Sequence, residues 1–341
     1  MSRERIAKWK SSPLLWPLVG LAAVLLFNAF FTPSFYQLEI REGHLYGSLV
    51  DVLNRGSIGV ILALGMTLVI ATGGVDLSVG SVMAISGAVA ALLLTETSWG
   101  LPLVVPCALG AAMIAGLANG ILVAKVGIQP IIATLILMVS GRGIARYITG
   151  EKVIALVNDD FSESFDFIAG GHFLGLPFPV TIAVVLTILT LLAVRTTVLG
   201  LFIESVGANE KASHIAGINA RGIKVLVYVF CGFCAGVAGL IDASNINAAD
   251  TANAGIFTEL DAIFAVVVGG TALTGGRFTL LGSVIGALLL QTLLTTMYTF
   301  GVSSDTAPIP KALVIIGVCL LQSEAFREKV FRASENRGGE R

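Results

Sequence analysis

The sequence predicts an all-α integral membrane protein with about ten transmembrane helices, and composition is the first reason. Hydrophobic residues make up 55% of the 341-residue chain and charged residues only 13%, whereas soluble domains usually carry about 25% charged residues. The second reason is that apolar runs close to the roughly 20 residues needed to cross a bilayer follow one another along most of the chain. We therefore expect one transmembrane domain over 1–341, in contact with membrane lipid.

Ten candidate spans result when the apolar runs are divided at glycine, proline and charged residues. They cover 14–31, 52–72, 79–94, 101–124, 129–148, 177–194, 223–243, 260–275, 279–300 and 309–323. Together they predict a helical bundle over 14–323, interrupted by a polar loop at 196–222. GxxxG spacings, which let helix backbones approach closely in lipid, occur at Gly116 and Gly120, Gly232 and Gly236, and Gly282 and Gly286.

Basic residues indicate how the chain is oriented. They flank the first and last spans as Arg3, Arg5, Lys8, Lys10, Arg327, Lys329, Arg332, Arg337 and Arg341. Because Lys and Arg gather on the cytoplasmic side of membrane proteins, we expect 1–13, 196–222 and 324–341 in the cytoplasm. The first apolar run is longer than a signal-peptide core and no small-residue cleavage pattern follows it, so we expect it to remain uncleaved.

Asp76 is the most unusual charge in the apolar part of the chain. It follows the pair Gly73-Gly74, and between Arg55 and Lys125 the only other charged residue is Glu96. A carboxylate inside a span costs roughly 2.5–3.5 kcal/mol on insertion scales. We therefore expect Asp76 at a break in the helix, hydrogen-bonded to backbone N–H groups or wetted by a translocation path. The alternative is a position at the membrane surface, capping the helix that starts near Ser78.

Two segments, 67–89 and 265–290, share a pattern of an apolar run, Gly-Gly, a short polar break and Gly-Ser-Val opening a second run. Glycine-interrupted spans in corresponding positions point to a substrate path, because unwound backbone at membrane depth survives only where protein or water satisfies it. Chance similarity between glycine-rich apolar stretches is the alternative. The polar side chains predicted to line the path are Asp76, Ser78, Asn119, Gln129, Asn245 and Asn247. The four amides could equally bridge helices.

The stretch 200–224 is too long for a tight turn and too mixed for a span. Within it, Asn209 can cap a short helix, Glu210 suits its first turn, and Gly217 can end it. We therefore expect a short helix on the cytoplasmic side. A solvated connector without a partner is the alternative.

Several classes of function are disfavoured by missing motifs. The chain has no G-x-x-x-x-G-K-[ST] phosphate loop, so it is not an ATP-hydrolysing subunit, and it has neither an HExxH nor a GxSxG motif. We expect no catalytic residue, no metal and no cofactor in this chain, and no nucleic acid partner. Cys231 and Cys234 have a redox spacing but lie in an apolar run, where we interpret them as packing residues. A secondary transporter driven by an ion gradient stays open as an alternative.

Three motifs in order carry a resemblance to a known family. VGANEKASHIAGI (206–218), GMTLVIATGGVDLSVGSV (65–82) and ELDAIFAVVVGGTALTGGRF (259–278) resemble the membrane permeases of ribose-type ABC sugar importers. The stretch ADTANAGIFTELDAI (249–263) is most similar to the galactofuranose importer permeases within that family. The likeness covers roughly 45–322.

The resemblance implies a multi-pass subunit of the bacterial inner membrane that imports a monosaccharide, such as a galactofuranose-like or other furanose or pentose sugar. It implies a dimer with a second permease chain, identical or related, and a periplasmic sugar-binding protein outside. Inside, partner ATPase subunits would hold ATP and Mg. The loop expected to contact the ATPase contains Gly207, Asn209, Glu210, Ala212, Ala216 and Gly217. Ser213, where many relatives have alanine, and 291–296, where many have Asn-Gly-Leu, depart from the family pattern.

Overall fold

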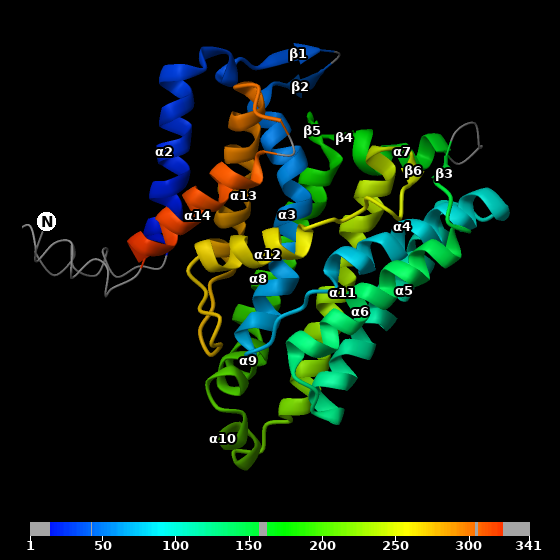
Figure 1. The fold of residues 1–341 in the computed structure, drawn as a ribbon, viewed down its shortest axis with the longest axis vertical. Helices are drawn as coiled ribbons and strands as arrows, with labels where there is room; N and C mark the ends of the chain where they lie inside the picture. The colour runs from blue at the N-terminus through cyan, green and yellow to red at the C-terminus, as the bar shows by residue number, and fades with distance from the viewer. Residues whose placement is uncertain (1–13, 42, 157–161, 304–305, 323–341) are drawn as a thin grey trace, which may run out of the picture.

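The structure of the chain, a computed structural model, describes residues 14–41, 43–156, 162–303 and 306–322. Long helices dominate it (Figure 1). The α-helices are α2 Leu15–Phe31, α3 Ser48–Ala71, α4 Val79–Glu96, α5 Leu101–Ile121, α6 Pro130–Ile148, α7 Ser162–Gly170, α8 Phe178–Thr196, α9 Leu199–Ala208, α10 Glu210–Ile215, α11 Ala220–Asn245, α12 Thr258–Val268, α13 Leu280–Thr299 and α14 Pro308–Gln322.

The remaining elements are short. A 3₁₀ turn, η1, covers Pro33–Tyr36, and a π-helical turn, η2, extends α5 over Leu122–Val126. Three antiparallel strand pairs join loops, namely β1 Glu39–Arg41 with β2 His44–Tyr46, β3 Ile154–Ala155 with β6 Ala248–Ala249, and β4 His172–Phe173 with β5 Leu176–Pro177. Each strand is two or three residues long, so helix packing carries the fold.

Seven of the described helices are long and apolar enough to cross a membrane: α3, α4, α5 with η2, α6, α8, α11 and α13. The helices α2 and α14 occupy the predicted spans at the two ends of the bundle but are only 17 and 15 residues long. The predicted count of ten spans is therefore not confirmed, although the predominantly helical architecture is. The predicted terminal segments 1–13 and 324–341 lie outside the described residues.

The predicted span 260–275 is not one helix. The helix α12 has 11 residues and is about 16 Å long at 1.5 Å per residue, roughly half the thickness of a bilayer core. It ends at Gly269 and Gly270, and Gly270 has a φ of 87°. The chain then turns through a glycine-rich loop, 269–279, before α13 begins. Apolar composition alone did not reveal this break.

The helix α11 lies at the centre of the bundle, between α3, α4 and α5. One glycine of its GxxxG pair, Gly232, meets Gly116 of the GxxxG pair of α5. A Cβ added at Gly232 would lie 3.1 Å from the Gly116 Cα and 2.6 Å from the Ala112 carbonyl oxygen. The two backbones thus touch directly, which supplies van der Waals contact where lipid provides no hydrophobic drive. Cys231 and Cys234 are buried on the same helix and free, in agreement with a packing role.

The two ends of the molecule are different. Figure 1 shows β1, β2, β4 and β5 at one end and α9 and α10 at the other. Leu14, directly before α2, lines a cavity together with Arg195 and Glu204, so the chain enters the bundle at the end where α9 lies. The helix α14 packs against α2 and α12.

The α5–α11 contact gives a first prediction. Gly232→Ala should lower the melting temperature of the detergent-purified chain, because the added methyl would overlap backbone that cannot yield, and overpacking costs about 1–3 kcal/mol. Gly110→Ala is the matched control, since Gly110 lies in α5 with open space around it. Equal melting temperatures for the two variants would contradict close packing at this crossing.

Candidate functional site

Asp76 lies in the loop 72–78 that separates α3 from α4, and its side chain is 1% exposed. Its Oδ1 accepts hydrogen bonds from the Ser78 backbone N–H at 2.9 Å and the Ser78 hydroxyl at 2.6 Å. The amide of Asn119 on α5 donates to the same oxygen at 3.3 Å. The prediction of a helix break with bonds to backbone N–H groups is therefore confirmed.

The position of Asp76 explains how a carboxylate is held without a cation. It lies at the N-terminus of α4, where the helix dipole favours a negative charge. Asn119 also donates to the Ser78 hydroxyl at 2.8 Å, and the Tyr228 hydroxyl on α11 donates to the Val75 carbonyl at 3.2 Å. Side chains from α5 and α11 thus fix the loop between α3 and α4. The whole cluster is buried within the protein and directly precedes α4, and the alternative position at the membrane surface stays a prediction.

The six predicted path residues do not form one group. Asp76, Ser78 and Asn119 share the buried cluster, and there Asn119 bridges helices. Gln129 is exposed at the N-cap of α6, on the side where α11 begins. Asn245 and Asn247 lie at the other end of α11. Their proposed contact with a substrate stays a prediction.

Asn247 has a local structural role. Its φ of 47° is left-handed, and its amide donates to the Asp166 carboxylate of α7 at 3.1 Å. Its carbonyl accepts from the Leu156 N–H at 2.8 Å. Asn247 therefore ties the turn after α11 to two neighbouring segments at this end of the bundle.

The predicted short helix in the loop 196–222 is confirmed as α10. The Asn209 side chain accepts from the Ala212 N–H at 3.0 Å and caps the helix, and Gly217, with a φ of 86°, follows its end. Glu210 forms an ion pair with Lys224 at 2.6 Å, which ties the helix to the start of α11. Figure 1 shows α10 projecting from the bundle.

The surface of α10 is open. Ala212, Ala216 and Gly217 are exposed, and the apolar side chain of Ile215 is 87% exposed. A groove of about 580 Å³ runs beside the helix and is lined by Glu210, Lys211, His214, Ile215, Asn219, Ala220 and Arg221. An exposed isoleucine beside a charged groove suits a partner protein better than free water.

Gly207 differs from the other residues of the predicted coupling loop, because it packs inside the molecule. It lies on α9, and a Cβ added there would overlap the Ala71 carbonyl oxygen at the end of α3 and lie 2.6 Å from the Gly276 nitrogen. The Gly276 N–H donates to the same Ala71 carbonyl at 3.0 Å. A Cβ added at Gly275 would lie 2.8 Å from the Gly73 nitrogen. We call these four residues, Gly73, Gly207, Gly275 and Gly276, the glycine junction.

The glycine junction brings together the two segments that share a sequence pattern. Each segment consists of a helix, a glycine break and a second helix, as α3–α4 and as α12–α13. The breaks, 72–78 and 269–279, lie against each other and against α9. The Ala71 carbonyl, freed at the first break, accepts from the Gly276 N–H of the second break, the kind of internal pairing that unwound backbone in a membrane requires.

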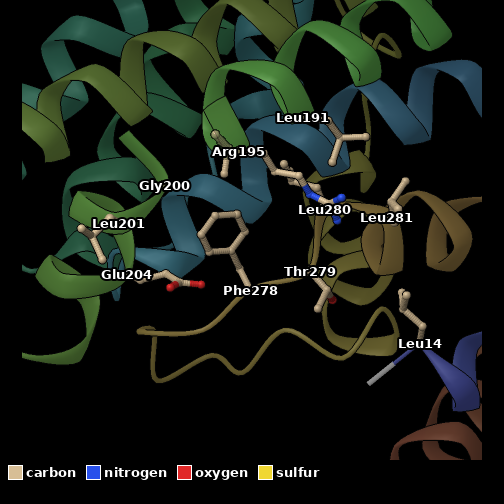
Figure 2. A pocket seen from close by; sticks show the side chains of 11 residues that line it. Leu14, Leu191, Arg195, Gly200, Leu201, Glu204, Phe278, Thr279, Leu280 and Leu281 are labelled. Atoms are coloured by element: carbon tan, nitrogen blue, oxygen red, sulfur yellow. The ribbon is translucent and has the colours of Figure 1, made fainter. Parts of the chain in front are cut away.

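A cavity of about 340 Å³ lies on the outer side of this region, between α8, α9 and the start of α13. Figure 2 shows Arg195, Glu204, Phe278 and Thr279 around it, with Leu14 at its edge. None of the six predicted path residues lines this cavity. It therefore belongs to the α9 end of the molecule and not to the Asp76 cluster.

Arg142 of α6 and Lys311 of α14 were not among the residues singled out from the sequence. Arg142 of α6 donates through Nη1 to the Ala254 carbonyl and, at 3.5 Å, to the Thr251 carbonyl. Asp261 of α12 forms an ion pair with Lys311 of α14. The available signal was the pair Arg142 and Arg146 inside the predicted span 129–148, since charged residues within spans commonly mark functional sites.

The Asp76 cluster gives a second prediction. Asp76→Ala should lower the melting temperature clearly more than Asp76→Asn. Alanine leaves three buried donors without an acceptor, at about 1–3 kcal/mol for each unsatisfied group, whereas asparagine keeps an oxygen in place. Thermal unfolding of the purified variants measures the difference. Equal losses for both variants would contradict the hydrogen-bonding role.

Comparison with known proteins identifies the family. Residues 48–322 match the family described as branched-chain amino acid transport system / permease component. The chain is 48% identical over 316 residues to the galactofuranose transporter permease protein YtfT of Escherichia coli (strain K12), which covers 91% of each chain. It is 39% identical over 323 residues to the fructose import permease protein FruF of Bifidobacterium longum (strain NCC 2705), which covers 93% of this chain and 90% of that protein.

A third relative, the ribose import permease protein RbsC of Escherichia coli (strain K12), is 37% identical over 311 residues, which covers 90% of this chain and 92% of that protein. No solved structure gives a significant match. The family match includes the seven helices long enough to span a membrane, both breaks and α10. This chain therefore belongs to the family of branched-chain amino acid transport system permease components.

Proposed function

We propose that this chain is the membrane permease subunit of an ATP-binding cassette importer for a monosaccharide. Two observations together carry the proposal. Two membrane helices are interrupted at glycines, and the interruptions contact α9. The short helix that follows α9, α10, projects from the bundle. Relatives named for galactofuranose, fructose and ribose transport support a sugar as cargo. A galactofuranose-like or other furanose or pentose sugar fits these names best.

Broken helices suit the passage of a neutral polyhydroxyl compound. A conduit needs hydrogen-bonding groups at membrane depth without a tight pocket that would trap the cargo. Half-helices provide such groups, because their first N–H groups and their last carbonyls have no partner within the helix. In this chain, α4 begins after the first break and α12 ends at the second.

The partners follow from the two ends of the bundle. We infer that the α10 end faces the cytoplasm with both chain termini, and that ATPase subunits holding ATP and Mg dock there. The periplasmic sugar-binding protein would then dock at the end with the β1–β2 and β4–β5 hairpins, which the Leu45 N–H joins by donating to the Gly175 carbonyl at 3.0 Å. A second permease chain in the bacterial inner membrane completes the assembly.

A rigid α10 is well suited to transmit movement of the ATPase. The Asn209 cap and the Glu210–Lys224 ion pair hold it in one orientation relative to α11. The preceding helix, α9, contacts the end of α3 through Gly207. A displacement of α10 by a partner is therefore expected to reach both breaks through direct backbone contact.

The third prediction tests the docking of α10. Ala216→Arg should abolish both pull-down of the partner ATPase and ATP-dependent uptake of sugar, because a long cation on the exposed C-cap of α10 would clash in a partner's groove. Insertion into the membrane should persist, since no contact within the bundle changes. Ala216→Ser is the matched control and should bind and transport like the parent.

Two outcomes would contradict the proposal. If Ala216→Arg binds the ATPase and transports sugar normally, α10 is only a connector. If the parent chain moves sugar in proteoliposomes in response to an ion gradient, without ATP or partner subunits, the chain is a secondary transporter.

A further inference from the structure

The N-termini of α4 and α12 meet inside the bundle. A Cβ added at Gly255, which has a φ of 62°, would lie 2.7 Å from the Gly80 carbonyl oxygen. Thr258, the first residue of α12, donates through its hydroxyl to the Gly255 carbonyl at 2.9 Å. The turn before α12 is thereby pressed onto the first turn of α4. This contact places the start of α12 beside the break that contains Asp76.

Phe257, the N-cap residue of α12, has an unusual backbone conformation. Its φ of 62° and ψ of 4° are left-handed, and its side chain is 65% exposed. This conformation costs an L-residue roughly 1–2 kcal/mol and is a genuine outlier for a bulky side chain. Such strain persists only where the surroundings impose it, and it clusters at functional sites.

The surroundings that impose it are visible in the loop 246–257. The Asp250 carboxylate accepts from the Asn253 amide at 2.7 Å and from the backbone N–H groups of Ala252 and Asn253. The Asn253 amide in particular holds the pKa of this carboxyl below its usual value. Arg142 binds the carbonyls of Ala254 and Thr251 further along the loop. These bonds fix the approach to Phe257, so we regard Arg142 as a positioning residue.

Glu259 lies two residues beyond Phe257, in the first turn of α12. Its Oε2 would be 2.8 Å from a Cβ added at Gly80, so the carboxylate lies over the start of α4. Arg142 is close enough for the two charges to interact, but the Arg142 contacts with oxygen acceptors are to backbone carbonyls. The Glu259 carboxylate interacts with its own backbone N–H, and among the residues that the structure describes no side chain donates a hydrogen bond to it. Its carboxylate, half-buried, is an available acceptor.

The helix α12 is held by two helices that are long enough to span the membrane. It packs against α3 and α13, and Figure 1 shows it crossing beside them, partway along their length. Charged groups at such depth face the bundle interior or a water-filled cavity. A partly exposed carboxylate next to an exposed aromatic ring therefore points to a wet surface.

We propose that Phe257 and Glu259 form a sugar-contacting station in the translocation path. The Phe257 ring would stack on the apolar C–H face of a monosaccharide, and the Glu259 carboxylate would accept a hydrogen bond from one of its hydroxyl groups. One aromatic surface and one acceptor suit transient binding, because a tight pocket would need more contacts. The inference rests on the proposed function and adds the residues that touch the cargo.

Thiol labelling tests whether the station is wet and occupied. In a parent carrying Cys107→Ser and Cys319→Ser, which leaves only buried cysteines, the Phe257→Cys variant should react with a small charged methanethiosulfonate at least tenfold faster than Phe31→Cys. Phe31 is the matched control, since it is also 65% exposed but lies on the outer helix α2. The importer is used whole, in proteoliposomes with its ATPase and binding protein, and D-galactose, D-fructose and D-ribose are the probes.

A transported sugar should slow labelling of Phe257→Cys severalfold during turnover. No reaction, or a reaction rate that no sugar changes, would overturn the inference. Transport gives an independent readout on the same assembly. Phe257→Leu and Glu259→Gln should each lower the sugar moved per ATP hydrolysed by about fivefold or more, and Phe257→Trp should lower it less than Phe257→Leu. Phe31→Leu should match the parent.

Pull-down of the ATPase should succeed for every variant, which separates loss of the station from failure to fold. If the parent transports sugar and the Phe257 and Glu259 variants move the same amount of sugar per ATP hydrolysed, the station is refuted. The proposed function would remain intact. A parent that moves none of the three sugars with ATP would instead remove the proposed function, and the station with it.

Discussion

The fold depends on contact between unwound backbone segments where α9 meets the two breaks in the membrane bundle. Two helices are interrupted there, and each interruption frees N–H and C=O groups that lipid cannot satisfy. The Ala71 carbonyl, left free at the end of α3, accepts from Gly276 of the second break at 3.0 Å. A Cβ would block this approach at Gly207 and Gly275, and Gly73 has a left-handed φ of 79°.

The glycine junction also connects parts of the structure that are far apart in the sequence. It joins α9, and through it the projecting helix α10, to the breaks that precede α4 and α13. The start of α4 is held in turn by Asp76 and Asn119, and it supports the start of α12 through Gly80. One chain of contacts therefore runs from an exposed surface to polar groups inside the bundle, as an energy-coupled permease requires.

Sequence predicted the features set by local chemistry. The bounds of α10 followed from Asn209 and Gly217, and GxxxG spacing indicated close helix packing without naming the Gly116–Gly232 contact. Features that depend on contacts between residues far apart in the sequence were not predictable. Hydropathy did not distinguish the half-helix α12 from a full span, although the Gly-Gly pattern in 265–290 indicated an interruption there, and the close approach of Gly269 to Gly282 was not visible in the sequence. Path candidates were chosen as single polar residues, so the contact of Glu259 with the start of α4, far away in the sequence, was missed.

Gly207→Ala in the assembled importer tests the central claim most directly. The added methyl would overlap the Ala71 carbonyl and must displace α9 from both breaks, whereas Asn209 and the exposed surface of α10 are unchanged. The account predicts that the variant still binds its ATPase in a pull-down but loses most of its ATP-driven sugar uptake. Normal ATPase binding together with normal uptake would contradict the account, because α10 would then act without the glycine junction.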